Sequence, residues 1–411
     1  MSVPHLLIAR GARSMLLAAA ATSGTVPLVA RAETRVNVDV SAGATAASNP
    51  YLLVGPDTQA LGANLTIDPS IFFEKEDTSI LLDGSLSLEK FFRRYGFDES
   101  IALAASGEHR VDERTTLAAN VGFRSSESAA RRFFGGPDLV ELEPGEFPDG
   151  GIIDPTLGNL GGRTKRLDVN ASVKHVTGPD AVLTASAGLG LTRVESDFGL
   201  DYRDSTFDVS YARQLTTKTS FLGTVNIGYA DYLGRRAGDG VYVTALAGGE
   251  HRFSKSLYVS GQLGASLSAV ESTVGGRSTS VSWAGNLDLC DRRTRATLCV
   301  TGSRSAQPTS RGGLTTVSSI GASYAHTFGT AASASITATY ARSSRFRTDL
   351  APVFNRHSDL AAVSGTYRHE LGERVSAFAT PSFTSIADEA SSRRENYQIL
   401  MGLAYHFGRI R

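Results

Sequence analysis

Strict alternation of apolar and polar residues recurs along most of the chain and constrains its fold more than any other feature. From Arg35 to Ala42 every second residue is apolar, and the pattern returns in 82–89 and 281–289. A period of two places one set of side chains on each face of a β-strand. Many such strands of about ten residues, separated by turn residues, are the signature of a transmembrane β-barrel.

The connections between the expected strands alternate between short and long. The short ones are 74–77, 112–114, 177–180, 215–218, 254–256, 291–294, 329–331 and 371–373. The long ones are 45–57, 92–98, 128–165, 195–201, 232–239, 271–279, 304–312, 342–356 and 387–394. This rhythm predicts an all-β, antiparallel up-and-down barrel of about 18 strands (16–18), with short periplasmic turns and both termini in the periplasm.

The N-terminus has the features of an export signal. Arg10 and Arg13 precede an apolar stretch, 15–21, and Ala30-Arg31-Ala32 offers a small-x-small cleavage site before Glu33. We therefore expect residues 1–32 to be a cleavable signal peptide, a disordered soluble N-terminus being the alternative. The expected domain organisation is this signal followed by one outer-membrane β-barrel, 33–411, with a long outer loop at 128–165.

Composition agrees with a barrel and excludes several other classes. Lysine and arginine (41) balance aspartate and glutamate (41), and removing 1–32 takes away only arginines, so the remaining chain is slightly acidic. This balance gives no indication of nucleic-acid binding. No window beyond the N-terminus has the roughly 18–20 consecutive apolar residues of a membrane helix. If the chain spans a membrane, it does so with strands.

Six of the eight histidines stand at strand ends beside the short turns. They are His109, His175, His251, His326, His369 and His406. The first five share the parity of the apolar residues, whereas His406 has the opposite parity. This parity spreads the first five around the outside of the barrel at headgroup level, where amphipathic side chains are favoured. A metal or catalytic site would instead need them to converge, so we expect neither.

Cys290 and Cys299 flank a short turn, and both have the polar parity of their strands. Their spacing permits a directly facing pair, and a disulfide is favoured in an oxidising periplasm. The sequence leaves open whether they are bonded or are two small lumen-side residues.

The last strand resembles the C-terminal assembly signal of outer-membrane barrels. Gly402, Tyr405 and Phe407 carry this resemblance, while the tail 408–411 departs from the family pattern, which usually ends on the aromatic residue. The resemblance implies the barrel-assembly machinery as a partner, besides outer-membrane lipid and lipopolysaccharide.

The chain as a whole resembles the Gram-negative β-barrel porins found in exopolysaccharide loci. The resemblance rests on Ser48-Asn49-Pro50-Tyr51-Leu52, on the strand Leu65–Pro69 and on the series of short strands that ends in His406-Phe407. It implies a bacterial outer-membrane protein that passes secreted polysaccharide, and periplasmic polysaccharide-export components as further partners.

The loop 128–165 carries an acidic cluster with arginines beside it. Its candidate residues are Asp138, Glu141, Glu143, Glu146, Asp149 and Asp154, flanked by Arg131 and Arg132. In porins the third outer loop folds into the lumen and sets the constriction, and rings of acidic side chains favour cations or neutral solutes. A solvated surface loop and a lid are the alternatives that the residues leave open.

Strand parity also predicts the lumen face. Its polar residues are Arg35, Asp39, Asn64, Arg124, Asp168, Lys174, Arg193, Asp208, Asn226, Glu250, Gln262 and Asp288. The mixed charges predict no strong ion selectivity. Side chains cannot fill a barrel of this strand number, so an aqueous channel is expected.

These observations favour a non-enzymatic channel for hydrophilic material, without cofactor or metal. Passive solute diffusion is the less specific alternative, and a plugged structural or adhesin barrel is the rival from another class. An outer-membrane hydrolase would need a nucleophile beside a histidine at the outer rim, where only His357 is expected.

Overall fold

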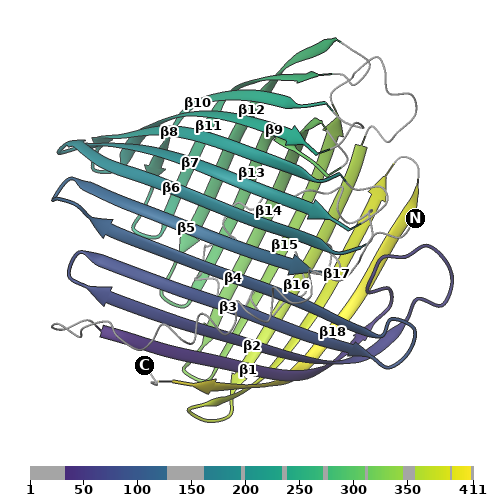
Figure 1. Cartoon of the computed structure of the whole chain (residues 1–411). Coiled ribbons are helices and arrows are strands. Elements are labelled where there is room, and N and C mark those ends of the chain that lie inside the picture. Colours follow the sequence, from purple (N-terminus) through teal and green to yellow (C-terminus); the bar gives the residue numbers. More distant parts are fainter. Residues whose placement is uncertain are drawn as a thin grey trace, which may run out of the picture.

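The structure is a computed structural model that describes residues 33–126, 162–195, 200–233, 238–271, 276–310, 313–345, 357–388 and 391–408. Every regular element in these ranges is a β-strand, and 18 strands form one antiparallel sheet (Figure 1). Each strand pairs with its neighbours in sequence, and β1 also pairs with β18, which closes the sheet. The predicted all-β, up-and-down barrel of about 18 strands is confirmed.

The strands are long for a globular protein and similar in length. They are β1 (Glu33–Ala47), β2 (Ala60–Lys75), β3 (Thr78–Phe91), β4 (Phe97–Arg110), β5 (Thr115–Ser126), β6 (Thr164–Gly178), β7 (Ala181–Val194), β8 (Tyr202–Thr216), β9 (Thr219–Tyr232), β10 (Gly240–Arg252), β11 (Leu257–Glu271), β12 (Arg277–Arg292), β13 (Ala296–Pro308), β14 (Leu314–Phe328), β15 (Ala332–Arg345), β16 (His357–Glu370), β17 (Val375–Asp388) and β18 (Ser391–Phe407). The described part of the chain holds no helix long and apolar enough to cross a membrane.

Alternation gives the barrel an apolar exterior and a polar lumen. Large apolar side chains lie exposed on one face of the strands, among them Leu189, Val281 and Trp283, which are 62%, 72% and 60% exposed. In water such a surface would be unfavourable by about 25 cal/mol for each Å² of apolar area, whereas hydrocarbon accepts it. An apolar exterior around a closed barrel is the arrangement of outer-membrane proteins, so the bacterial outer membrane is the location of this chain.

The two ends of the barrel differ in their connections. At one end, here the turn rim, lie the eight short connections predicted from the sequence, and there β1 begins and β18 ends. The opposite end, here the loop rim, holds the longer connections. The predicted signal peptide, 1–32, lies outside the described residues.

Two expected long connections at the loop rim, 387–394 and 304–312, are wrong in their bounds. β17 continues to Asp388 and β18 begins at Ser391, while β13 continues to Pro308. Arg393 and Glu395, on the exterior face of β18, form an ion pair with 2.9 Å between Nε and Oε1. The strands therefore continue beyond the apolar band, where their exterior residues are polar. Apolar alternation stops at the edge of that band, so it predicts strand ends that are too early.

The histidines lie as their parity predicts. His109, His175 and His251 are on the exterior face near the turn rim, and the Nδ1 of each lies 2.9–3.0 Å from a threonine hydroxyl of the preceding strand. His406 instead faces the lumen, with Nδ1 2.7 Å from Oδ1 of Asp39. The spacing around the barrel keeps the exterior histidines apart.

The closing seam between β1 and β18 requires close backbone approach. Gly43 and Gly402 lie directly opposite each other. A Cβ atom on Gly402 would lie 2.2 Å from the carbonyl oxygen of Ala42, and one on Gly43 would lie 2.5 Å from that of Met401. Glycine at both positions therefore lets the first and last strands meet.

Replacing Gly402 by alanine should weaken closure, because the added methyl group collides with backbone rather than with a movable side chain. We expect Gly402→Ala to lower the free energy of unfolding by about 1–3 kcal/mol. Urea unfolding in lipid vesicles, followed by the fluorescence of the single tryptophan, Trp283, measures this. Gly122→Ala is the matched control, because a Cβ there meets nothing within 4 Å; equal losses in both variants would contradict the argument.

Candidate functional site at the loop rim

The β13–β14 hairpin leaves the barrel wall at the loop rim and folds inward. Pairing between β12 and β13 ends at Gly285 and Arg304, although β13 continues to Pro308. Beyond that point β13 contacts β10 and β11, and β14 contacts β11, although none of these is its neighbour in the sheet. We call 305–316 the inward hairpin; 311–312 lie outside the described residues.

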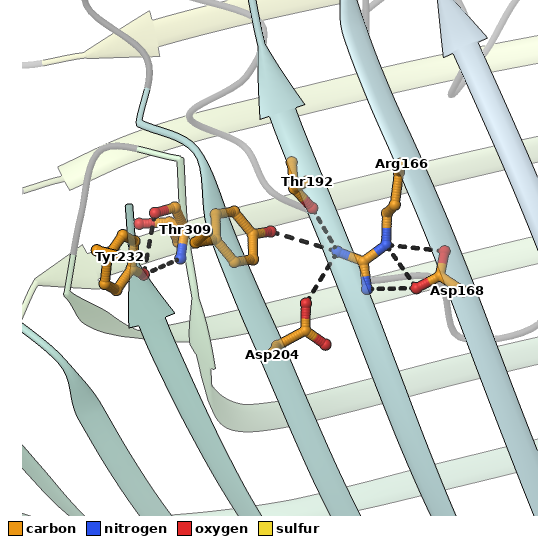
Figure 2. Close-up of polar contacts among 7 residues, drawn as sticks. Arg166, Asp168, Thr192, Asp204, Tyr232 and Thr309 are labelled. Atoms are coloured by element: carbon orange, nitrogen blue, oxygen red, sulfur yellow. Dashed lines mark hydrogen bonds and ion pairs between the residues drawn. The ribbon is translucent and has the colours of Figure 1, made fainter. Parts of the chain in front are cut away.

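Hydrogen bonds from β9 hold the tip of the inward hairpin. The hydroxyl of Tyr232 accepts a hydrogen bond from the backbone N–H of Thr309 (3.1 Å; Figure 2). It donates one to the carbonyl of Gly313 (2.6 Å). The backbone N–H of Leu200 donates to the carbonyl of Ser310 (2.7 Å). These bonds satisfy backbone groups of a tip that is fully buried at Thr309 and Ser310, as buried backbone requires.

An apolar cluster lies beneath the same hairpin. Ala306 and Leu314 pack against lumen-side residues of four strands: Tyr202, Ala230, Tyr232, Tyr242 and Val270. Gly228 faces Tyr242 across the β9–β10 pairing, and a Cβ there would lie 2.1 Å from the tyrosine ring. The glycine thus makes room for the ring, which in turn covers the exposed backbone. The hairpin is seated by burial of apolar surface as well as by hydrogen bonds.

Arg166 is the centre of a polar network beside this cluster. Its guanidinium forms an ion pair with Asp168 (Nη2–Oδ1 2.6 Å) and lies 3.5 Å from Oδ1 of Asp204. Nη1 donates to the hydroxyl of Thr192 at 2.9 Å, and Tyr202 lies within 3.4 Å (Figure 2). A largely buried arginine needs such charged and polar partners. The network fixes Tyr202, whose ring lies 5.5 Å from that of Tyr232, so it also supports the seat of the hairpin.

The β1–β2 connection, 48–59, is the second inward segment. Leu52 is 2% exposed and packs against lumen-facing Ala341, Leu360, Ala362 and Ile386 of β15–β17. Its φ of 51° is unusual for leucine. Asn49 stabilises this backbone: its Oδ1 accepts from the N–H of Leu53 (2.9 Å), and its own N–H donates to Oδ1 of Asn396 (2.9 Å).

Aromatic residues join this segment to the β3–β4 connection. The ring of Tyr51 lies 6.0 Å from Phe91 and 4.8 Å from Tyr95. Tyr95 donates from its hydroxyl to the carbonyl of Thr58 (3.0 Å). Burial raises the pKa of Tyr95, which keeps the hydroxyl protonated and able to donate.

The two inward segments narrow the loop rim from different sides. The hairpin rests on β8–β11, whereas the β1–β2 segment rests on β15–β17 and beside β3. Both place apolar residues against the lumen wall. The site is thus a narrowed mouth above a polar lumen, suited to admitting or retaining solutes.

Charges of the lumen are often paired with a neighbour two residues away on the same strand face. Arg35 pairs with Glu33 (2.9 Å), Arg252 with Glu250 (2.8 Å) and Arg368 with Glu370 (3.7 Å), besides Arg166 with Asp168. Pairing at this spacing neutralises charge locally. The lumen therefore carries charged groups with little net field from these pairs.

Hydroxyl groups also pair across neighbouring strands of the lumen. Thr244 lies 2.9 Å from Ser266, Ser303 lies 2.7 Å from Ser319, and Thr337 lies 2.9 Å from Ser364. A hydroxyl can donate and accept, so these rows offer both functions along the wall.

The structure places most predicted lumen residues on the lumen face. These are Arg35, Asp39, Asn64, Arg124, Asp168, Lys174, Asp208, Asn226, Glu250, Gln262 and Asp288, each on the strand face opposite the exposed apolar residues. The constriction candidates Asp138, Glu141, Glu143, Glu146, Asp149, Asp154, Arg131 and Arg132 lie outside the described residues.

The lumen assignment of Arg193 is wrong. Arg193 shares the face of the exposed Leu183 and Leu189, and its cross-strand neighbour is Lys165. Lys165 forms an ion pair with Glu195 on the same exterior face. Near the loop rim the exterior lies beyond the apolar band, so charge there does not indicate the lumen.

Cys290 and Cys299 lie directly opposite each other on β12 and β13 and form a disulfide. Both are buried on the lumen face. Tyr405 and Phe407 of the C-terminal strand are on the exterior, with ring centroids 4.4 Å apart, and Gly402 lies at the closing seam. Their role in assembly stays a prediction.

Sequence reasoning missed the residues that hold the two inward segments. Leu52, Tyr232, Tyr242 and Leu314 each look like ordinary strand or loop residues. A partial signal was present: Tyr202, Tyr232 and Tyr242 all have lumen parity at the loop-rim ends of their strands, where polar residues are expected. Large buried aromatic residues on a lumen face indicate that something covers them.

Among the described residues, no group of three or more histidine, cysteine, aspartate or glutamate side chains is placed to hold a metal ion. Comparison with known proteins finds no matching family model and no matching curated sequence.

Solved structures with a similar overall shape include three outer-membrane proteins. OccK2 (OpdF) of Pseudomonas aeruginosa has a TM-score of 0.45 at 9% identity, covering 92% of this chain and 99% of that one. The FrpB iron transporter of Neisseria meningitidis has a TM-score of 0.45 at 8% identity, covering 91% and 83%. OprD of Pseudomonas aeruginosa has a TM-score of 0.43 at 9% identity, covering 92% and 96%.

Tyr232→Phe should loosen the inward hairpin while leaving the barrel intact, because it removes only the hydroxyl that bonds Thr309 and Gly313. We expect loss of about 1–2 kcal/mol of local protection from amide hydrogen exchange at the hairpin. Exchange mass spectrometry of the refolded barrel measures it. Tyr229→Phe is the control, because its hydroxyl is on the exterior and bonds Asp239 (3.0 Å); similar exchange in both variants would contradict the proposed seat.

Proposed function

We propose that this barrel is a channel that passes neutral hydrophilic solutes across the outer membrane through a mouth narrowed by two inward segments. The observation that carries the proposal is a lumen lined by paired hydroxyls and by locally paired charges. A barrel of 18 strands encloses more space than its own side chains fill. Water and solutes are the natural occupants of such a lumen.

Pairing of the lumen charges supports weak selection between ions. Rings of one charge create selectivity because their fields add. Here arginines such as Arg35, Arg252 and Arg368 stand beside acidic residues on the same face, so their fields largely cancel beyond the Debye length of about 8 Å. An uncharged cargo passes without an electrostatic barrier.

Secreted polysaccharide is the finer form of this proposal. A polysaccharide presents many hydroxyls, and the serine and threonine rows of the lumen can exchange hydrogen bonds with them repeatedly along the wall. Resemblance to porins of exopolysaccharide loci supports the same cargo. Periplasmic polysaccharide-export components would then deliver the chain to the turn rim.

Orientation follows the usual arrangement of such barrels, with short turns in the periplasm and longer loops outside. The loop rim then faces the cell exterior, among lipopolysaccharide headgroups, and both ends of the barrel sequence are periplasmic. Exterior charges near this rim, including Lys165 and Arg193, suit that polar layer. The C-terminal strand is the element that the barrel-assembly machinery would bind.

Planar-bilayer recording tests the channel and its weak selectivity. We expect steady single-channel current from the purified barrel and a reversal potential close to zero under a potassium chloride gradient. A strongly cation- or anion-selective current would contradict the role of paired lumen charges. Absence of current from a correctly folded barrel would favour the plugged structural barrel instead.

Unseating the inward hairpin should widen the mouth. Leu314→Asp places a charge in the apolar cluster with Ala306 and Tyr242, which burial strongly disfavours. We expect higher single-channel conductance than in the wild type. Leu298→Asn, on the exterior face of the part of β13 that pairs with β12, is the control that should leave conductance unchanged. Unchanged conductance in both variants would show that the inward hairpin does not limit flow.

A neutral gluco-oligosaccharide should interrupt the current if polysaccharide is the cargo. We expect brief blocking events whose frequency rises with oligosaccharide concentration and with chain length. Current that ignores the sugar, in a channel that otherwise conducts, would leave passive diffusion of small solutes as the function.

A further inference from the structure

The seam between β12 and β13 has the shortest strand pairing of the barrel. Eight residue pairs join the two strands, from Arg292 and Thr297 to Gly285 and Arg304. Within the described residues, the next shortest seams, β4–β5 and β1–β18, have ten pairs each. The difference arises because the β13–β14 hairpin turns into the lumen above Arg304. Residues Val281–Ala284 of β12 pair with β11 but lack partners on the β13 side, although the residues that would face them there, Ser305–Pro308, are part of the described chain.

The split lies at the level of the membrane. Val281 and Trp283 on the free part of β12 face the exterior and are the large apolar residues that mark the lipid band. Backbone groups at this depth normally pair within the barrel, because each unsatisfied group in hydrocarbon is unfavourable by several kcal/mol. A strand edge without pairing is tolerated at that level where water or a polar ligand reaches it. Lumen-facing Ser280 and Ser282 on the same edge have buried hydroxyls without a hydrogen-bond partner in the described structure.

A cationic side chain stands at the apex of the split. The guanidinium of Arg304 lies 4.6 Å from the ring centre of exterior Trp283, and its Nη1 donates to Ser318 (2.6 Å). Its Nε is buried without a hydrogen-bond partner among the described residues. An arginine on the lipid face of a barrel is unfavourable unless an anion or the interface accepts it. The residue is therefore suited to a phosphate or carboxylate headgroup held at the split.

The Cys290–Cys299 disulfide closes the lower part of the same seam. It crosses β12 and β13 between the split and the turn rim. A covalent bond at this position holds the two strands together where their pairing is shortest. Separation of the strands is thereby confined to the half of the seam nearer the loop rim.

From these observations we propose that the β12–β13 seam is a lateral opening between the lumen and the outer leaflet. It accepts an amphiphile whose anionic headgroup contacts Arg304 while its acyl chain passes between β12 and the inward hairpin. The orientation of the opening rests on the proposed function, which places the loop rim outside. The lateral path itself is independent of whether neutral solutes also flow along the barrel axis.

Photolabelling tests the opening in the intact barrel. The probe is dodecyl phosphate with a diazirine in its chain, added to vesicles that contain the purified protein and mapped by mass spectrometry. Lipid-facing residues will be labelled everywhere, so the diagnostic positions face the lumen. We expect acyl label on Ser280 and Ser282, and none on Thr337 and Ser364, which face the lumen at the fully paired β15–β16 seam. Equal absence of label at both seams would overturn the proposal.

Two variants sharpen the result. Ser282→Cys with Gln307→Cys, the positions that would face each other if the β12–β13 register continued beyond Gly285 and Arg304, would seal the seam with a second disulfide and should abolish the label at Ser280. Asn286→Cys with Ser303→Cys is the control within the paired region and should leave the label unchanged. Label that persists in a variant shown to be sealed would overturn the proposal.

Arg304→Gln keeps the seam open without the charge. It should reduce labelling by dodecyl phosphate more than labelling by a dodecyl glucoside with the same diazirine, and this comparison stands even if the new disulfide does not form. Equal reduction of labelling by both probes would show that Arg304 does not bind the anionic headgroup. Bilayer current is recorded from each preparation. An unaltered barrel that conducts but shows no label at Ser280 and Ser282 counts against the lateral opening alone. A labelled barrel that carries no current counts against the proposed channel.

Discussion

Backbone hydrogen bonding in a medium without water is the constraint on which the rest of this structure depends. A strand in hydrocarbon must pair on both edges, and only a closed sheet offers every strand two partners. The chain meets this condition by pairing β1 with β18, where the facing Gly43 and Gly402 let the backbones approach. Once the sheet is closed, each side chain faces either lipid or the lumen, so alternation alone assigns most of the sequence to one of two environments.

This two-way choice explains how much of the fold could be predicted from the sequence. Strand number, the short turns and the exterior histidines follow from parity, because lipid imposes an apolar requirement on one face and water relaxes it on the other. The rule weakens where lipid ends. At the loop rim, Arg193 lies outside the barrel and Arg393 extends a strand beyond its apolar part. Polar residues there carry no information about which face they occupy.

The narrowed mouth could not be predicted for a different reason. Its contacts join segments far apart in sequence: Tyr232 bonds Thr309, and Leu52 packs on Ile386. No local pattern encodes such pairs, and a glycine opposite a tyrosine, as at Gly228 and Tyr242, has many structural meanings. Only the presence of large tyrosines with lumen parity hinted that the wall near the loop rim is covered. Tertiary packing of this kind depends on where the barrel curvature brings strands together, which strand parity does not contain.

At the β12–β13 seam, closure of the sheet and narrowing of the mouth place opposing demands on the same strand. A hairpin that turns inward to cover Tyr202 and Tyr242 must abandon the neighbour that it would have paired with in the wall. The barrel retains eight residue pairs and a disulfide below that point, enough to keep the sheet closed through the lower half of the seam. Above it, the backbone of Val281–Ala284 still pairs with β11 but has no partner on the β13 side, while Ala306 and Leu314 are buried against the lumen wall. The wall is therefore weakest beside the element that narrows the mouth, so access along the axis and access through the side depend on the same hairpin.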